Sequence, residues 1–264
     1  MSRVAETFER LRREGRRGFI PFVTAGDPDL ETTRALLFEL ARAGATLIEL
    51  GVPFSDPVAD GPTIQRASER ALRNGVGLGD ALAVVSAFRR GSDVPVVLFS
   101  YFNPLLQFGP ERLAAEAARA GTDAVLVTDL VPEESSDFNS ALARRGLDQI
   151  FLAAPTTSDA RLRLIAERAR GFVYAVSRAG VTGARTDLNA EAERLVARLR
   201  TVTTLPVAVG FGVSTREQVA AVWRYADAAV VGSALVAEIE RQAGAPDLVR
   251  RVGDFARALL PAAP

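Results

Sequence analysis

Three carboxylates gather in one short stretch of this sequence. Glu49 ends an apolar run, and Asp56 and Asp60 follow in a loop that three prolines stiffen. The chain has no His, no Cys and no Lys, so all 32 basic side chains are Arg. A His base, a Cys nucleophile, a Lys Schiff base and a His/Cys metal cage are therefore excluded. The groups that remain available for catalysis are carboxylates, Tyr, hydroxyls and backbone amides. We expect no metal site.

Glu49 stands where a strand would end. Alternation along this run places Leu47 and Glu49 on one face of the strand and Ile48 and Leu50 on the other. If Ile48 and Leu50 pack beneath helices, Glu49 points to the opposite face, where partial desolvation raises its pKa. A raised pKa suits a carboxyl to proton transfer near neutral pH. An ion pair with an Arg at the rim is the alternative, and position alone does not separate the two.

Asp56 and Asp60 each fit three roles: a catalytic group, a turn former or a helix cap. Asp60-Gly61-Pro62 is an ordinary turn sequence, and spacing alone favours that interpretation. However, a helix predicted from Thr63 through Ala71 anchors one end of the loop. This anchor would let the Asp60 side chain reach over a site next to Glu49.

The elements that must position these acids are eight short apolar runs rich in β-branched residues. Segments with helical spacing, such as Leu30–Ala43 and Glu111–Ala120, separate them. Strand and helix in alternation predict right-handed crossovers and a buried parallel sheet. Eight units predict an α/β fold, a single (β/α)8 TIM barrel over residues 1–264. The runs are Phe19–Thr24, Thr46–Gly51, Pro95–Tyr101, Asp123–Thr128, Asp148–Ala153, Phe172–Ser177, Pro206–Phe211 and Ala228–Gly232.

An open doubly wound sheet is the competing architecture. It would ordinarily carry a G-x-G-x-x-G turn after its first strand. The only nearby imitation, Gly210-Phe211-Gly212, comes late and lacks the third glycine, so we expect no dinucleotide site. Helical segments at Val4–Arg13 and Asp247–Leu260 are additional to the eight units, and we expect them to cap or seal the barrel.

Composition limits the partners. With 48% hydrophobic and 24% charged residues the chain is typical of a globular protein. Thirty-two basic residues balance 32 acidic ones, so no global field attracts nucleic acid or an anionic membrane. No apolar run approaches the roughly 20 residues of a membrane span, and the start has no secretory pattern. We therefore expect a cytoplasmic enzyme.

Three glycine-containing loops predict a phosphate site. They are Val181–Ala184, Gly210–Ser214 and Gly232-Ser233, and each follows one of the last three strands. Barrels of this kind often bind phosphate there, with backbone N–H groups and a helix N-terminus facing the anion. Glycine allows the close approach without a lysine. The segment from Arg178 to Leu188 is either a lid that excludes water or an ordinary surface loop.

Taken together, these motifs closely resemble the alpha subunit of tryptophan synthase. The match covers nearly the whole chain in order, and the string E-L-G-V-P-F-S-D-P-V-A-D-G-P-T-I-Q is too long for chance. The other matching motifs are P-F-V-T-A-G-D-P at 21–28, Y-F-N-P-L at 101–105, S-R-A-G-V-T-G at 177–183, G-F-G-V-S at 210–214 and G-S-A at 232–234.

The resemblance implies retro-aldol cleavage of indole-3-glycerol phosphate to indole and glyceraldehyde 3-phosphate. In the family, the glutamate that matches Glu49 is the general acid and base. The aspartate that matches Asp60 accepts a hydrogen bond from the indole N–H. Tyr174 matches a tyrosine beside the glutamate, and Thr182 matches a lid residue that contacts the aspartate on closure.

The resemblance also implies binding residues and a partner. Phosphate binding carries over to Thr182, Gly183, Phe211, Gly212, Gly232 and Ser233, and Phe211 also falls near the indole pocket. The indole pocket carries over to Phe22, Ile64, Phe99, Leu126, Leu152 and Val231. The family partner is a PLP-dependent beta subunit in an α2β2 tetramer, which Pro53, Asp56, Pro57, Asn103 and Pro132 would face. No cofactor is expected in this chain.

Three rival functions stay open. A related phosphate-binding barrel of the same pathway, a synthase or isomerase, would call on lysine or cysteine, which this chain lacks. A non-catalytic subunit that only activates a partner would not need Glu49 and Asp60. A free-standing lyase that releases indole would differ in its turnover without a partner.

Overall fold

Eight parallel strands close into a barrel in the computed structural model, which describes residues 2–176, 188–210 and 212–261. Each strand pairs with the next in sequence, and β8 pairs with β1. This closure confirms the TIM-barrel prediction and excludes the open sheet. The strands are β1 Gly18–Thr24, β2 Ile48–Gly51, β3 Val96–Ser100, β4 Ala124–Val127, β5 Asp148–Ala153, β6 Val173–Val176, β7 Val207–Gly210 and β8 Ala228–Val231.

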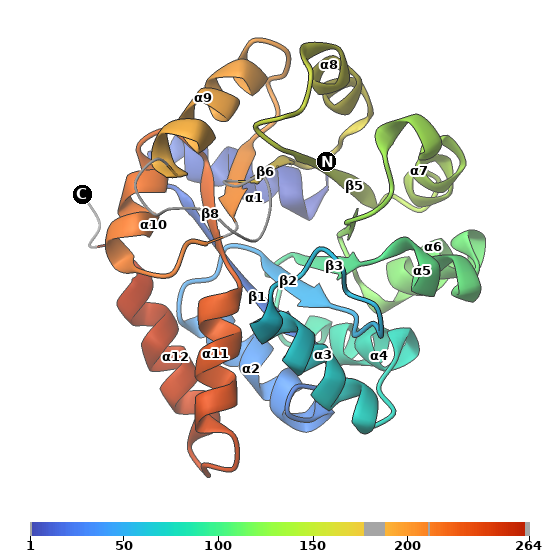
Figure 1. The fold of residues 1–264 in the computed structure, drawn as a ribbon. Coiled ribbons are helices and arrows are strands. Elements are labelled where there is room, and N and C mark those ends of the chain that lie inside the picture. Colours follow the sequence, from blue (N-terminus) through green and yellow to red (C-terminus); the bar gives the residue numbers. More distant parts are fainter. Residues whose placement is uncertain (1, 177–187, 211, 262–264) are drawn as a thin grey trace.

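Helices form the outer ring around these strands (Figure 1). Within the described part of the chain, none of them is both long and apolar enough to cross a membrane. The helices are α1 Arg3–Arg13, α2 Leu30–Arg42, α3 Pro62–Arg73, α4 Leu78–Arg89, α5 Phe102–Phe108, α6 Pro110–Ala120, α7 Ser136–Ala143, α8 Asp159–Arg168, α9 Leu188–Arg200, α10 Arg216–Trp223, α11 Ser233–Gln242 and α12 Leu248–Leu259, with the 3-10 helix η1 Pro132–Glu134.

Strand alternation divides the core into two layers. Ile48 and Leu50 belong to the outer layer between the strands and the helices. Leu47 belongs to the inner layer within the barrel, with Phe22 and Phe99. Each strand thus has one face toward the barrel axis and one toward the helices. The prediction that Ile48 and Leu50 pack beneath helices is confirmed.

The two additional helices have different places. α1 closes the end of the barrel where the strands begin: its Phe8 ring lies 5.6 Å from that of Phe172 in the inner layer. Arg3 and Ser2 donate to Asp123 and Asp148, which stand at the starts of β4 and β5. α12 instead packs beside α2 and α11 in the outer ring (Figure 1), so its predicted sealing role is wrong. The apolar residues of α12 are buried against these neighbouring helices.

Candidate active site

A cavity of about 500 Å³ opens where the strands end. Its walls come from the end of β1, from β2 and the loop after it, and from the ends of β3, β5, β6 and β8. This is the face at which barrels of this kind place their chemistry. The sequence-predicted residues that line it are Phe22, Glu49, Asp60, Ile64, Phe99, Leu152, Tyr174, Gly212, Gly232 and Ser233; Val58, Ala59, Gly61, Val176 and Val230 complete it.

Glu49 lies on the floor of this cavity with 1% of its surface exposed. Its neighbours in the sheet are Phe22 on β1 and Val97 on β3, so apolar side chains surround the carboxyl. Glu49 Oε1 has no hydrogen-bond partner among the described residues, and none of the ion pairs found there involves Glu49. Burial raises the pKa of Glu49 to about 8. The carboxyl therefore keeps its proton at neutral pH and can also release it.

This burial predicts a stability that depends on pH. A pKa raised from 4.5 to about 8 favours the folded state while Glu49 is protonated, and that contribution is lost as pH rises through the folded pKa. Glu49→Gln cannot ionise, so its free energy of unfolding should exceed that of the wild type increasingly between about pH 5 and pH 9, by a few kcal/mol at the upper end. Urea unfolding at several pH values measures this. An equal difference at every pH would contradict it.

Asp60 reaches the cavity from the loop between β2 and α3. Its Oδ2 accepts a hydrogen bond from the Tyr101 hydroxyl at 3.0 Å, and that hydroxyl accepts one from the Ala59 N–H at 2.9 Å. The Gln65 side chain, on the first turn of α3, donates to the Asp60 carbonyl. Burial raises the pKa of Asp60 to about 6, although the Tyr101 hydrogen bond lowers it. Asp60 is therefore a fixed carboxylate that is charged at neutral pH.

Tyr174 is buried on β6 beside both acids. Burial, followed by the negative charges of Glu49 and Asp60, raises its pKa well above the usual value, so the phenol stays protonated. Its hydroxyl lies against the backbone of Gly210 at the end of β7, where a Cβ would collide with it. Glycine at this position gives the tyrosine its room.

The part of the cavity beside α11 suits an anion. Gly232 is the N-cap of α11, and Ser233 opens this ten-residue helix. Its first N–H groups have no partner within the helix and carry the positive end of the helix dipole. Gly212 has φ of 94°, a backbone conformation that favours glycine. Thr182, Gly183 and Phe211 lie outside the described residues, as does the predicted lid segment apart from Leu188.

Comparison with known proteins identifies the family to which this chain belongs. A family model described as tryptophan synthase alpha chain matches residues 8–259. This chain belongs to the tryptophan synthase alpha chain family. The resemblance seen in the motifs is confirmed, and the chain is a lyase subunit of tryptophan biosynthesis.

Relatives in sequence and in structure agree. The alpha chain of Geobacter sulfurreducens is 51% identical over 259 residues, 98% of each chain. That of Caulobacter vibrioides (strain NA1000 / CB15N) is 52% identical over 91% of this chain and 88% of its own. The crystal structure of the alpha subunit from Legionella pneumophila superposes with a TM-score of 0.91 at 37% identity, over 98% and 97% of the two chains. Tryptophan synthase from M. tuberculosis in its aminoacrylate-bound form gives 0.87 at 38% identity, over 98% and 100%.

Two predicted pocket residues of this alpha chain do not line the cavity. Val231 belongs to the outer layer, and its neighbour Val230 lines the cavity instead, so the prediction for Val231 is wrong by one position in the strand alternation. Leu126 lies in the inner layer opposite Phe99 in the register but is fully buried beneath the cavity lining.

Tyr101 is a contact of Asp60 that the sequence did not predict. It is 3% exposed, its ring packs 5.2 Å from that of Phe54, and its hydroxyl holds Asp60. Its position directly after β3, at the catalytic end of a strand, is the feature that could have indicated it. However, a tyrosine at that position is equally consistent with a residue of the hydrophobic core.

The predicted partner surface is only partly exposed. Asp56 and Asn103 are exposed and Pro57 is half-buried, whereas Pro53 and Pro132 are buried and offer a partner little surface. Pro53 stands two residues after the end of β2, and the N–H of Val52 between them donates to the Phe99 carbonyl on β3. Pro132 opens η1, and the Ser135 hydroxyl and the Arg168 guanidinium donate to its carbonyl. The two prolines shape the rim from beneath.

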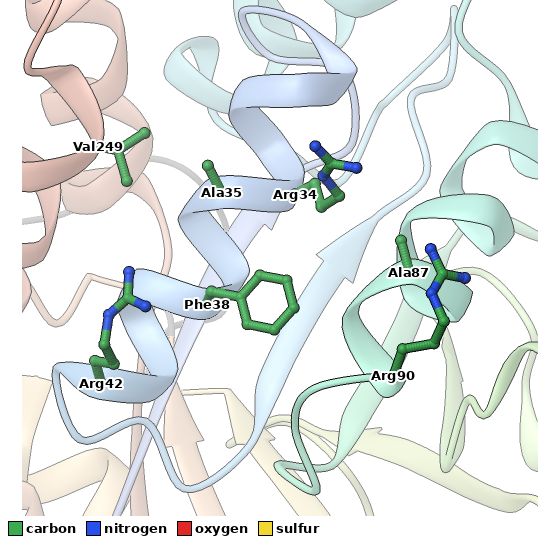
Figure 2. Close-up of a pocket in the computed structure, with 7 residues that line it drawn as sticks. All are labelled: Arg34, Ala35, Phe38, Arg42, Ala87, Arg90 and Val249. Carbon is green, nitrogen blue, oxygen red and sulfur yellow. The ribbon is translucent and has the colours of Figure 1, made fainter.

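A second hollow lies outside the barrel between α2 and α4 (Figure 2), with a volume of about 390 Å³. The Phe38 ring points into the space between these helices, with Arg34 and Arg90 nearby. The hollow has no carboxylate in its lining for proton transfer, and it shares no lining residue with the cavity at the strand ends. Its lining residues are Arg34, Ala35, Phe38, Arg42, Ala87, Arg90 and Val249.

Proposed function

We propose that this chain cleaves indole-3-glycerol phosphate to indole and glyceraldehyde 3-phosphate, with Glu49 as the acid and base. The observation that carries the proposal is a buried carboxyl with a pKa of about 8, set in an apolar cavity that also holds Asp60 and the N-terminus of α11. The cavity matches this substrate in three parts. The apolar floor suits the indole ring, the acids suit the reacting bond, and the helix N-terminus suits the phosphate.

In the first step, protonated Glu49 gives its proton to indole C3, and the ring becomes a cation with its charge centred on the ring nitrogen. Asp60 accepts a hydrogen bond from the ring N–H and stabilises this charge. Its fixed position, held by Tyr101, costs no reorganisation when the charge forms. Burial of both acids strengthens each interaction because the surroundings have a low dielectric constant.

In the second step, the Glu49 carboxylate removes the proton from the glycerol hydroxyl next to the ring. The carbon–carbon bond between that carbon and indole C3 breaks, and its electron pair returns to the ring. Indole leaves with the proton at C3, and the hydroxyl carbon becomes the aldehyde of glyceraldehyde 3-phosphate. Glu49 regains its proton, so the two steps balance without a cofactor in this chain. Tyr174 stands beside the acids and stays protonated, because burial and their negative charges raise its pKa.

Members of this family work with a beta subunit, and we propose that this chain forms an α2β2 tetramer with a PLP-dependent one. The exposed Asp56 and Asn103 lie on the same rim as three exposed apolar side chains. Val58, Leu106 and Val131 are 85%, 50% and 37% exposed, and they follow β2, β3 and β4 in turn. An apolar rim around the cavity mouth suits a partner that receives indole directly. Biosynthesis of this kind supports a cytoplasmic location.

The purified chain should release indole from indole-3-glycerol phosphate slowly alone and faster when a tryptophan synthase beta subunit is added. The physical reason is that a docked partner covers the rim and excludes water from the acids. Indole or tryptophan formation, with and without the partner, measures this. High turnover alone with no response to the partner would favour a free-standing lyase. No cleavage in either case, from folded protein, would favour a non-catalytic subunit.

A further inference from the structure

A network of ion pairs outside the cavity joins three elements. Arg70 on α3 donates from Nε and Nη2 to the two carboxylate oxygens of Asp27, at 2.7 and 2.9 Å. Its Nη1 donates to Glu240 on α11 at 2.7 Å. The Asp27 side chain is 1% exposed and that of Arg70 is 24% exposed, so the pair is shielded from water. Such a planar fork fixes both partners in direction as well as distance.

The contacts around Arg70 make this junction rigid. Asn74, at the C-cap of α3, donates to the carbonyl of Pro28 in the loop after β1. In the same loop, Gly26 has φ of 86° and packs so closely on Val76 that a Cβ would collide with it. The second half of α3 is therefore held against the loop after β1 and, through Arg70 together with Arg66, which also donates to both carboxylate oxygens of Glu240, against α11. Figure 1 shows α3 and α11 side by side.

The N-terminal ends of these two helices both border the cavity. α3 begins directly after Asp60 and Gly61, and its Gln65 holds the Asp60 carbonyl. α11 begins with Ser233 at the proposed phosphate site. A shift or rotation of one helix against the other would change the separation between Asp60 and that site. Arg70 is the residue whose one guanidinium contacts both the loop after β1 and α11.

We propose that Arg70 is a positioning residue for the cleavage reaction. It sets the separation between Asp60 and Ser233 to the length that one molecule of indole-3-glycerol phosphate spans. The inference rests on the proposed function, because the substrate must contact both walls at once. It acts through α3 and α11, and Arg70 itself does not touch the substrate.

The decisive variant is the pair Asp27→Asn with Arg70→Met. Removing Arg70 alone would leave the buried Asp27 charge unpaired and threaten folding, whereas the double variant leaves no unpaired buried charge in this network, since Glu240 keeps its ion pair with Arg66. We expect it to fold, with kcat/KM for indole-3-glycerol phosphate roughly 100-fold below the wild type, since a displacement near 1 Å can cost that much. Glycerol 3-phosphate contacts only the α11 wall, so its inhibition constant should stay within about threefold. The surface control is Arg73→Met, which removes an α3 arginine whose one ion-pair partner in the described part of the chain is the exposed Glu69, and it should cleave at the wild-type rate.

The outcomes separate positioning from general damage. A folded double variant that cleaves like the wild type would overturn the inference. So would a loss of glycerol 3-phosphate affinity as large as the loss of kcat/KM, because the α11 site itself would then be damaged. If the wild-type chain, with a beta subunit present, did not cleave the substrate, the proposed function would fail and this inference with it.

Discussion

Glu49→Gln is expected to cleave indole-3-glycerol phosphate roughly 10²- to 10⁴-fold more slowly than the wild type, because it can neither donate the proton to indole C3 nor remove the hydroxyl proton. The amide has the size of the carboxyl, and its site lies among apolar side chains, so the cavity should keep its shape. The loss should fall on kcat, since the interaction is made with the reacting atoms. Steady-state indole release, with a beta subunit present, measures it.

The matched control for this variant is Glu69→Gln. Glu69 lies on α3 with 60% of its side chain exposed, and Arg73 is its ion-pair partner. An exposed pair of this kind contributes little to stability, so this variant should cleave at the wild-type rate. Wild-type cleavage by Glu49→Gln would instead remove Glu49 from the mechanism and leave Asp60 as the only ionised carboxyl among the described residues that line the cavity.

Asp60→Asn is the second large effect, with an expected loss of roughly 10²- to 10³-fold in kcat, the range found when one preorganised charge-stabilising group is removed. The amide can still accept a hydrogen bond from the ring N–H, but it lacks the negative charge that stabilises the ring cation. Because Tyr101 can donate to the amide oxygen as it does to the carboxylate, the loop should keep its conformation. KM should therefore change less than kcat, and steady-state kinetics at pH 8 separates the two.

The pH dependence gives a sharper form of this test. Asp60 must be ionised to stabilise the cation, and its pKa is raised to about 6, so wild-type activity should fall as pH drops through that value. The Tyr101 hydrogen bond lowers this pKa. Tyr101→Phe removes the donor, so it should move the acid limb to higher pH while the alkaline rate stays closer to that of the wild type. An acid limb that does not move would show that Asp60 does not control it.

Most of the fold and of the site could be predicted from two features of the sequence: the periodicity of its apolar residues and the positions at which the strands end. The two-residue repeat of β2 placed Glu49 inside the barrel because Ile48 and Leu50 needed the helices. At β8 the four consecutive apolar residues Ala228–Val231 give no polar residue to mark the inner face, and Val231 was assigned to the indole pocket from the family resemblance alone. A one-residue error there exchanged Val231 for Val230.

Contacts between segments that are distant in the chain could not be predicted from the sequence. Tyr101 holds Asp60 across 41 positions, and Arg70 meets Asp27 across 43 positions. Many arginines on helices could pair with many acids, so nothing local marks Arg70 among the 32 basic residues. The burial of Asp27, which makes the pair strong, exists only once β1, α3 and α11 have packed together.

During translation, α1 is synthesised long before the residues on which it packs. Arg3, Ser2 and Phe8 contact Asp123, Asp148 and Phe172, so the docking site of α1 is complete only after residue 172 has been synthesised. α1 must therefore wait, with its apolar stripe uncovered, until the chain has been made as far as Phe172. For that interval Val4, Phe8 and Leu11 are open to chaperones and to neighbouring nascent chains. Their burial marks a late stage of barrel assembly, although α1 is made before any strand of the barrel.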